Sequence, residues 1–129
     1  MNVLELEGTM FQINLLNNFL PVEQEAFLKS TINELAHMSS LIDQIIKVWR
    51  MGDFQELQNL LNKEDDKNPR SKDVMEKLLY NRNDKMVETI NKILSNGKKV
   101  YIIVGAAHLV GDRGIINQLK TRGIKIKQL

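Results

Sequence analysis

The sequence contains no cysteine and no long apolar run. Without cysteine, the chain cannot form disulfides, thiolate nucleophiles or cysteine-based metal sites. No apolar stretch approaches the roughly 20 residues that a membrane-spanning helix needs, so we expect no membrane span. The start of the chain, Met1–Glu7, lacks both the basic region and the apolar stretch of a signal peptide, and the sequence therefore leaves the cellular compartment open.

Charge of either sign is also not in large excess. Eighteen lysines and arginines against sixteen aspartates and glutamates give a formal net charge of +2, and these charges are mixed along the chain. Nucleic-acid binding needs a basic face or stripe, so we expect no nucleic-acid partner. Hydrophobic residues make up 43% and charged residues 26% of 129 residues, an ordinary composition for a globular protein. We therefore expect a single domain over residues 1–129.

Most of the chain follows the apolar periodicity of helices. Pro21 stands where a helix can begin. Gly52 is typical of a helix end, and Asp53 is typical of the cap that starts the next helix. Residues 63–70 are polar and contain a proline, which predicts a loop. The expected helices cover residues 9–18, 21–36, 38–51, 54–61, 71–95 and 112–121.

Three short segments have the character of strands. Residues 100–104 are five consecutive strand-forming residues without a polar interruption, which is typical of a central parallel strand buried on both faces. Residues 2–6 and 124–126 are the other two expected strands. The predicted fold class is therefore α/β: a helix-rich protein with a few-stranded parallel or mixed sheet, a helical insertion between the first and second strands, and a C-terminal βαβ unit.

The loop Gly105–Gly114 follows the most strongly predicted strand, at the edge of the sheet where ligands bind in open α/β proteins. Three glycines and two alanines leave its backbone bare, and His108 is its one imidazole. The spacing is neither that of a dinucleotide-binding loop nor that of a Walker loop. From the residues alone, His108 is equally well a functional histidine or one bonded within its own loop. His37 has no nearby ligand set and is interpreted as structural or exposed.

Charged residues lie in two unusual places. Arg82 falls within the apolar stripe of the predicted helix 71–95, and a buried arginine is costly unless a carboxylate or a ligand meets it. Glu5 and Glu7 share one side of the first predicted strand, and either could meet Arg82 or His108. The alternative is that they are solvated edge residues or ordinary salt-bridge partners. No serine or threonine is arranged for a hydrolase triad.

The chain contains five short motifs: Arg82-Asn83 with Met86, residues 100–104, Gly105 to Gly111, Leu6-Glu7 followed by Gln12, and Trp49 to Asp53. Together they resemble the TraB/GumN family. Members carry an Arg-Asn-x-x-Met helix, an apolar strand, and a Gly-x-x-His-Leu-x-Gly loop. The resemblance covers nearly the whole chain, but members have two Gly-x-x-His loops and this sequence has only the second. It therefore resembles the C-terminal half of the family pattern.

The resemblance implies a metal-dependent hydrolase that acts on peptides, because the TIKI relatives are metal-dependent peptidases. A divalent metal such as Zn²⁺, Mn²⁺ or Co²⁺ is the implied cofactor, and a peptide or protein is the implied substrate. The implied site residues are catalytic Glu7, Arg82, Asn83 and His108, metal-binding His108 and Glu7, and substrate-binding Gly105, Ala106, Ala107 and Gly111.

The number of metal ligands in the chain is small for this chemistry. A catalytic metal usually has three protein ligands, and the chain offers one suitable histidine with one or two carboxylates. We therefore expect the site to be incomplete without the other half of the family pattern or a second copy in a homodimer. Two alternatives stay open: a non-catalytic peptide-binding or regulatory module, like the pheromone-shutdown proteins, and a self-associating fragment.

Overall fold

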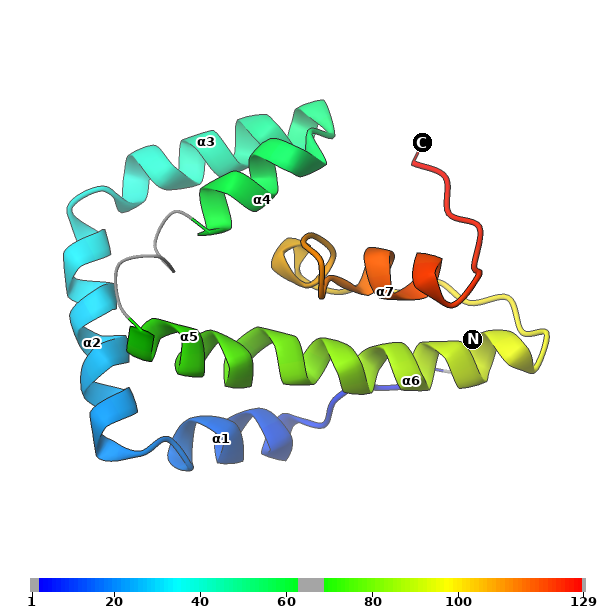
Figure 1. Ribbon diagram of the computed structural model, residues 1–129, viewed down its shortest axis with the longest axis horizontal. Helices are drawn as coiled ribbons and strands as arrows, with labels where there is room; N and C mark the ends of the chain where they lie inside the picture. The colour runs from blue at the N-terminus through cyan, green and yellow to red at the C-terminus, as the bar shows by residue number, and fades with distance from the viewer. Residues whose placement is uncertain (1–2, 63–68, 129) are drawn as a thin grey trace. The chain divides into compact units, whose positions relative to one another are not determined.

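The computed structural model describes residues 3–62 and 69–128, which divide into two compact units. Unit 1 contains residues 3–18 and 77–128, and unit 2 contains the described residues between 19 and 76. The prediction of a single domain stays a prediction. The elements in chain order (Figure 1) are α1 (Thr9–Asn17), α2 (Pro21–Leu35), α3 (Met38–Met51), α4 (Phe54–Asn62), α5 (Pro69–Met75), a π-helical turn (Glu76–Tyr80), α6 (Asn81–Ser95), a 3-10 turn (Ala106–His108) and α7 (Ile115–Thr121).

The predicted helices are confirmed, with small shifts at their ends, except that a π-helical turn at Glu76–Tyr80 divides the helix predicted at residues 71–95 into α5 and α6. Gly52 adopts a φ of 67°, and its N–H and that of Asp53 bond back to the last turn of α3, which is the expected helix end. The Asp53 carboxylate then accepts the N–H of Glu56 at 3.0 Å and caps α4. The last helix begins three residues later than predicted, because Gly114 is its N-cap.

The loop predicted at residues 63–70 is described only at its end. Residues 63–68 lie outside the described residues. Pro69 and Arg70 belong to α5 and not to a loop, so this part of the prediction is wrong. Proline is well tolerated in the first turn of a helix, where its missing N–H has no partner to lose.

The predicted α/β fold is wrong for residues 3–62 and 69–128, which contain helices but no strand, and hence no parallel or mixed sheet and no βαβ unit. Residues 100–104 are not buried on both faces, since the side chains of Tyr101 and Ile103 are 91% and 80% exposed. Strand-forming residues prefer a pleated, half-buried surface, but a strand exists only when a neighbour completes its hydrogen-bond ladder. The described part of this chain supplies no such neighbour to the three segments.

These segments still contribute to the core of unit 1. The core consists of side chains from the facing sides of α6 and α7, which lie side by side (Figure 1). Leu6, Val104, Ile124 and Ile126 from the three segments pack against it as partly buried residues. The core side chains are Met86, Val87, Ile90, Ile115 and Leu119.

Unit 2 is built from helix pairs: α2 packs with α5, and α3 packs with α4. Its buried apolar residues are few, and Phe19 and Phe27 add an edge-to-face ring contact with centroids 6.2 Å apart. None of the residues of α3 is buried, although α3 carries the clearest apolar stripe of the chain. The buried apolar side chains of unit 2 are Phe19, Leu57, Leu60 and Val74.

Candidate functional site

Arg82 meets the carboxylate that its position in the sequence requires, and the partner is Glu7. The Arg82 Nε atom donates to Glu7 Oε1 at 2.9 Å and Oε2 at 3.1 Å, and Nη2 donates to Oε2 at 2.7 Å. Nη1 donates to the carbonyl of Leu78 in the π-helical turn at 2.8 Å. The side chains of Arg82 and Glu7 are 17% and 7% exposed, so this bidentate ion pair is largely shielded from water.

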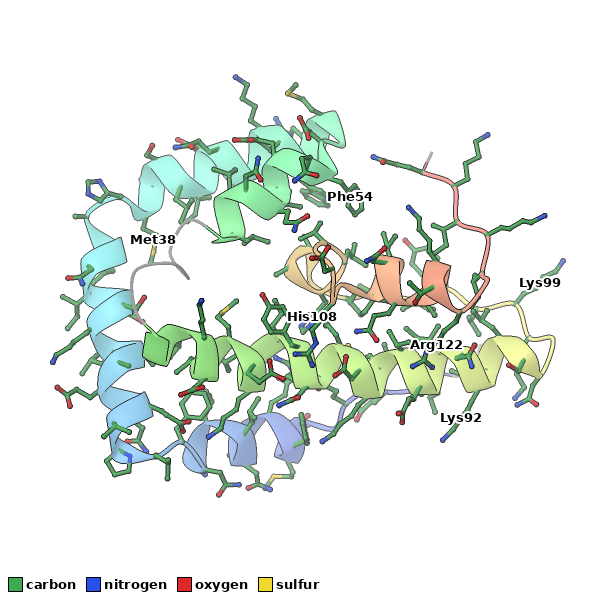
Figure 2. The ribbon with its side chains drawn as sticks, in the orientation of Figure 1. Met38, Phe54, Lys92, Lys99, His108 and Arg122 are labelled. Atoms are coloured by element: carbon green, nitrogen blue, oxygen red, sulfur yellow. The ribbon has the colours of Figure 1, made fainter. Side chains whose placement is uncertain are left out.

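Asn83, the next residue of α6, bonds to His108 across unit 1. Asn83 is fully buried, and its Oδ1 lies 2.6 Å from Nδ1 of His108. Its Nδ2 donates to the backbone carbonyl of Arg113 at 2.9 Å. His108 itself lies between the 3-10 turn that carries it and α6 (Figure 2). All four implied catalytic residues are therefore found in unit 1, in two bonded pairs from neighbouring positions of α6.

The contacts of Asn83 fix which nitrogen of His108 carries the proton. The amide nitrogen must face the Arg113 carbonyl, because two carbonyl oxygens would repel each other there, and so Oδ1 faces the imidazole. An amide oxygen only accepts, and therefore Nδ1 of His108 must be the protonated nitrogen. The neutral ring then keeps its lone pair on Nε2, which has no hydrogen-bond partner among the described residues.

The surroundings also keep the ring neutral. Partial burial lowers the pKa of His108 below its ordinary value of 6.5, because water no longer solvates the imidazolium. The positive charge of Arg82 lowers this pKa further, and the negative charge of Glu7 opposes both effects. At neutral pH the Nε2 lone pair is therefore available to a metal ion or a proton.

The loop that carries His108 is made of tight turns. Gly105 precedes the 3-10 turn, in which its carbonyl accepts the N–H of His108 at 3.0 Å. Gly111 has a φ of 89°, a backbone conformation that residues other than glycine rarely adopt. A Cβ atom on Gly114 would lie 2.3 Å from the carbonyl oxygen of Val110, so this position also requires glycine.

The four implied substrate-binding residues have different surroundings. Gly105, Ala106 and Ala107 lead directly into His108 in one turn, and a Cβ atom on Gly105 would lie 3.7 Å from the imidazole. Gly111 is required by the backbone of its own turn. Substrate binding by these residues stays a prediction.

The described residues do not form a complete metal site. Within residues 3–62 and 69–128, no three histidine, aspartate or glutamate side chains lie close enough to hold one ion. Both carboxylate oxygens of Glu7 accept hydrogen bonds from Arg82, but Oε1 accepts only one and keeps a lone pair. Metal binding by Glu7 stays a prediction. His108 Nε2 fits one ligand position, but a catalytic metal needs about three from protein.

The family is decided by comparison with known sequences. The sequence model of the TraB/PrgY/gumN family matches residues 1–128. The chain belongs to this family. A curated protein named Metalloprotease TIKI homolog, from Amphimedon queenslandica, is 33% identical over 58 residues, which are 43% of this chain and 11% of that protein. The chain thus spans only about a tenth of that relative's length. No solved structure matches the chain.

The helices of this TraB/PrgY/gumN chain were compared with the requirements of a membrane span. None of its described helices combines the length and the apolar character that crossing a membrane requires.

Sequence reasoning missed three residues around Asn83: Arg113, whose backbone carbonyl accepts from Asn83, and Asp84 and Gln118, which bond to Arg113. Asp84 Oδ2 accepts from Arg113 Nη2 at 2.6 Å, and Asp84 Oδ1 accepts from Gln118 Nε2 at 2.8 Å. Gln118 Nε2 also donates to the Arg113 carbonyl at 3.0 Å. Polar residues on helix surfaces usually face solvent, so only the proximity of Asp84 to the Arg-Asn motif could have singled it out.

Proposed function

We propose that this chain supplies the histidine-bearing part of a TraB-type hydrolytic site for peptides, and that the remaining groups come from outside the described residues. The observation that carries the proposal is the fixed imidazole of His108. Its Nδ1 proton is held by Asn83, its pKa is lowered, and its Nε2 atom has no partner within the described chain. A neutral histidine held in this way is suited to metal ligation or to general base catalysis.

A divalent metal, when bound, would activate water and polarise the scissile carbonyl. His108 would supply one ligand through Nε2, and the described residues do not complete the set. No reaction step through the metal follows from this chain alone. The remaining ligands would come from the other half of the TraB pattern or from a second copy in a homodimer.

We propose a further role for Glu7 and Arg82 beside the catalytic and metal-binding roles that the resemblance implies. The Nε, Nη1 and Nη2 atoms of Arg82 all donate within the protein, and both oxygens of Glu7 accept. We assign this pair to the electrostatics of the site, since its two charges act on His108 in opposite directions. Glu7 stays a candidate metal ligand, since its Oε1 atom accepts one hydrogen bond from Arg82 and keeps a lone pair.

Peptides are the proposed substrates because a matched relative bears the name of a metalloprotease homologue. The side chains that precede His108 are small, which leaves the backbone of the 3-10 turn accessible to an extended substrate. We propose that Gly105, Ala106 and Ala107 contact the substrate there. Gly111 shapes the turn behind them.

The incomplete ligand set favours a second candidate function, a non-catalytic peptide-binding or regulatory module. Such a module would bind peptide through the same loop without a metal. Its affinity for peptide would be unchanged after chelation. The hydrolytic function predicts that chelation abolishes turnover.

The test measures cleavage of a peptide library by mass spectrometry, with Zn²⁺, Mn²⁺ or Co²⁺ added and over a range of chain concentrations. We expect metal-dependent cleavage that His108→Ala abolishes, while the control His37→Ala, an exposed histidine, retains it. If a second copy completes the site, the rate rises with the square of chain concentration while the chain is mostly monomeric. At higher concentration the rate becomes linear, and light scattering gives twice 14.9 kDa. Absence of both metal binding and cleavage at every concentration contradicts the hydrolytic proposal, and metal-independent peptide binding then supports the regulatory module.

A further inference from the structure

The backbone carbonyl of Arg113 is shared by two side-chain amides from different helices. Asn83 of α6 donates to it at 2.9 Å, and Gln118 of α7 donates to it at 3.0 Å. A carbonyl oxygen has two lone pairs, so these donors use its full capacity as an acceptor. The loop before α7 is therefore attached to both helices through one atom.

Asp84 accepts hydrogen bonds from the side chains of both Gln118 and Arg113. Its Oδ1 atom accepts the second hydrogen of the Gln118 amide at 2.8 Å, and its Oδ2 atom accepts from the Arg113 guanidinium at 2.6 Å. Gln118 must therefore direct its nitrogen, and not its oxygen, toward Asp84 and the carbonyl. Arg113 is held at both its backbone and its side chain.

This arrangement bears on His108 through the amide of Asn83. An amide can turn over and exchange its oxygen and nitrogen, and the reversed form would present donors to Nδ1 of His108. The imidazole would then carry its proton on Nε2, and the open lone pair would be lost. The Arg113 carbonyl prevents the reversal, because it accepts from Nδ2 of Asn83 and would repel Oδ1.

We infer that Gln118 and Asp84 are positioning residues for His108: they hold the Arg113 carbonyl in the place that fixes the Asn83 amide, and so they keep the proton of the imidazole on Nδ1. Neither residue is hydrogen-bonded to His108. Their relevance to hydrolysis rests on the proposed function, but the tautomer they set is a property of the protein alone.

The test is a long-range ¹H–¹⁵N NMR spectrum of the His108 ring above pH 7, without metal or peptide. In the unmodified chain we expect Nδ1 in the protonated range and Nε2 in the unprotonated range. Gln118→Met keeps the length of the side chain and removes its donors, so both nitrogen signals should move toward each other. Asn117→Leu is the matched control, because Asn117 also donates to a loop carbonyl, that of Asp112, but contacts none of these groups.

A variant that fails to fold is replaced by Asp84→Asn, which lacks one of the two acceptors and should move the signals in the same direction. The inference is overturned if either variant folds, as judged by its backbone spectrum, and the His108 signals stay at their wild-type positions. Because the spectrum needs no substrate, this failure is distinct from failure of the proposed function. A shifted tautomer in a chain that never cleaves peptide would contradict only the hydrolytic proposal.

Discussion

The helices α6 and α3 carry apolar residues at the same spacing, but they differ in what covers them. The apolar face of α6 is buried and contains Asn83, whose amide atoms are both bonded. The face of α3 has no buried residue, and Ile42 and Trp49 are 47% and 66% exposed. Periodicity therefore predicts a helix without predicting its partner. Polar residues within an apolar stripe are the better indicator of a site, since they are buried only when bonded.

The largest expected difference between the two helices is in the cost of removing an apolar side chain. Ile90→Ala in α6 should lower the free energy of unfolding by about 2–5 kcal/mol, because Ile90 is fully buried and its removal leaves a cavity. Ile42→Ala in α3 should cost less than about 1 kcal/mol. Urea denaturation followed by circular dichroism measures both. Equal costs would show that the two faces are covered to the same extent.

Breaking the ion pair between Arg82 of α6 and Glu7 should have the next largest effect on stability. Arg82→Met leaves the Glu7 carboxylate shielded from water without its partner, which should cost about 3 kcal/mol. The double variant Glu7→Gln with Arg82→Met should recover most of that loss, because no unpaired charge remains. Thermal denaturation of the three forms tests the pair. If the single variant Arg82→Met has the melting temperature of the wild type, the Arg82 side chain is not paired with Glu7 in solution.

Two glycines of the His108 loop should respond differently to alanine. Gly114→Ala places a methyl group against the Val110 carbonyl and should cost about 1–3 kcal/mol. Gly105→Ala meets only an ordinary contact with His108 at a normal φ, so the fold should be unchanged. If Gly105 contacts substrate, its variant loses peptide affinity at wild-type stability. A Gly105→Ala chain that unfolds early would contradict this assignment.

The smallest expected effect is a dependence of stability on pH that arises from His108. Its pKa in the folded chain lies below the value of 6.5 in the unfolded chain, so the unfolded chain binds more protons between these two values. Stability should therefore fall as the pH drops below about 6.5, and it should be complete above that value. His108→Gln should remove this part of the dependence. A wild-type chain that becomes more stable in the same range would reverse the sign we assign.

Local signals in the sequence were sufficient to predict the helices. Gly52 and Asp53 act through hydrogen bonds to their own neighbours, so their effect can be predicted without knowing the fold. The strands failed because a ladder needs a second segment that residues 100–104 do not contain. Apolar side chains alone cannot distinguish a paired strand from an unpaired segment.

Some side chains of the candidate site could also be singled out from the sequence. Arg82 and His108 stand out as polar groups in apolar or bare surroundings. The residues alone also offered Glu5 and Glu7, and the resemblance selected Glu7 and added Asn83. The role of Gln118 could not be predicted, because it depends on where the Arg113 carbonyl lies in space. The sequence left open whether Glu5 or Glu7 meets Arg82 or His108, and only the structure shows that Glu7 bonds to Arg82.

The most direct test of the histidine-bearing site is the ¹⁵N spectrum of the unmodified chain during a Zn²⁺ titration. The account predicts that His108 starts with its proton on Nδ1, and that Zn²⁺ shifts the Nε2 signal while Nδ1 stays protonated and bonded to Asn83. His37 serves as the internal control and should respond only at higher Zn²⁺ concentration. A His108 ring that carries its proton on Nε2, or that responds no earlier than His37, would contradict the account.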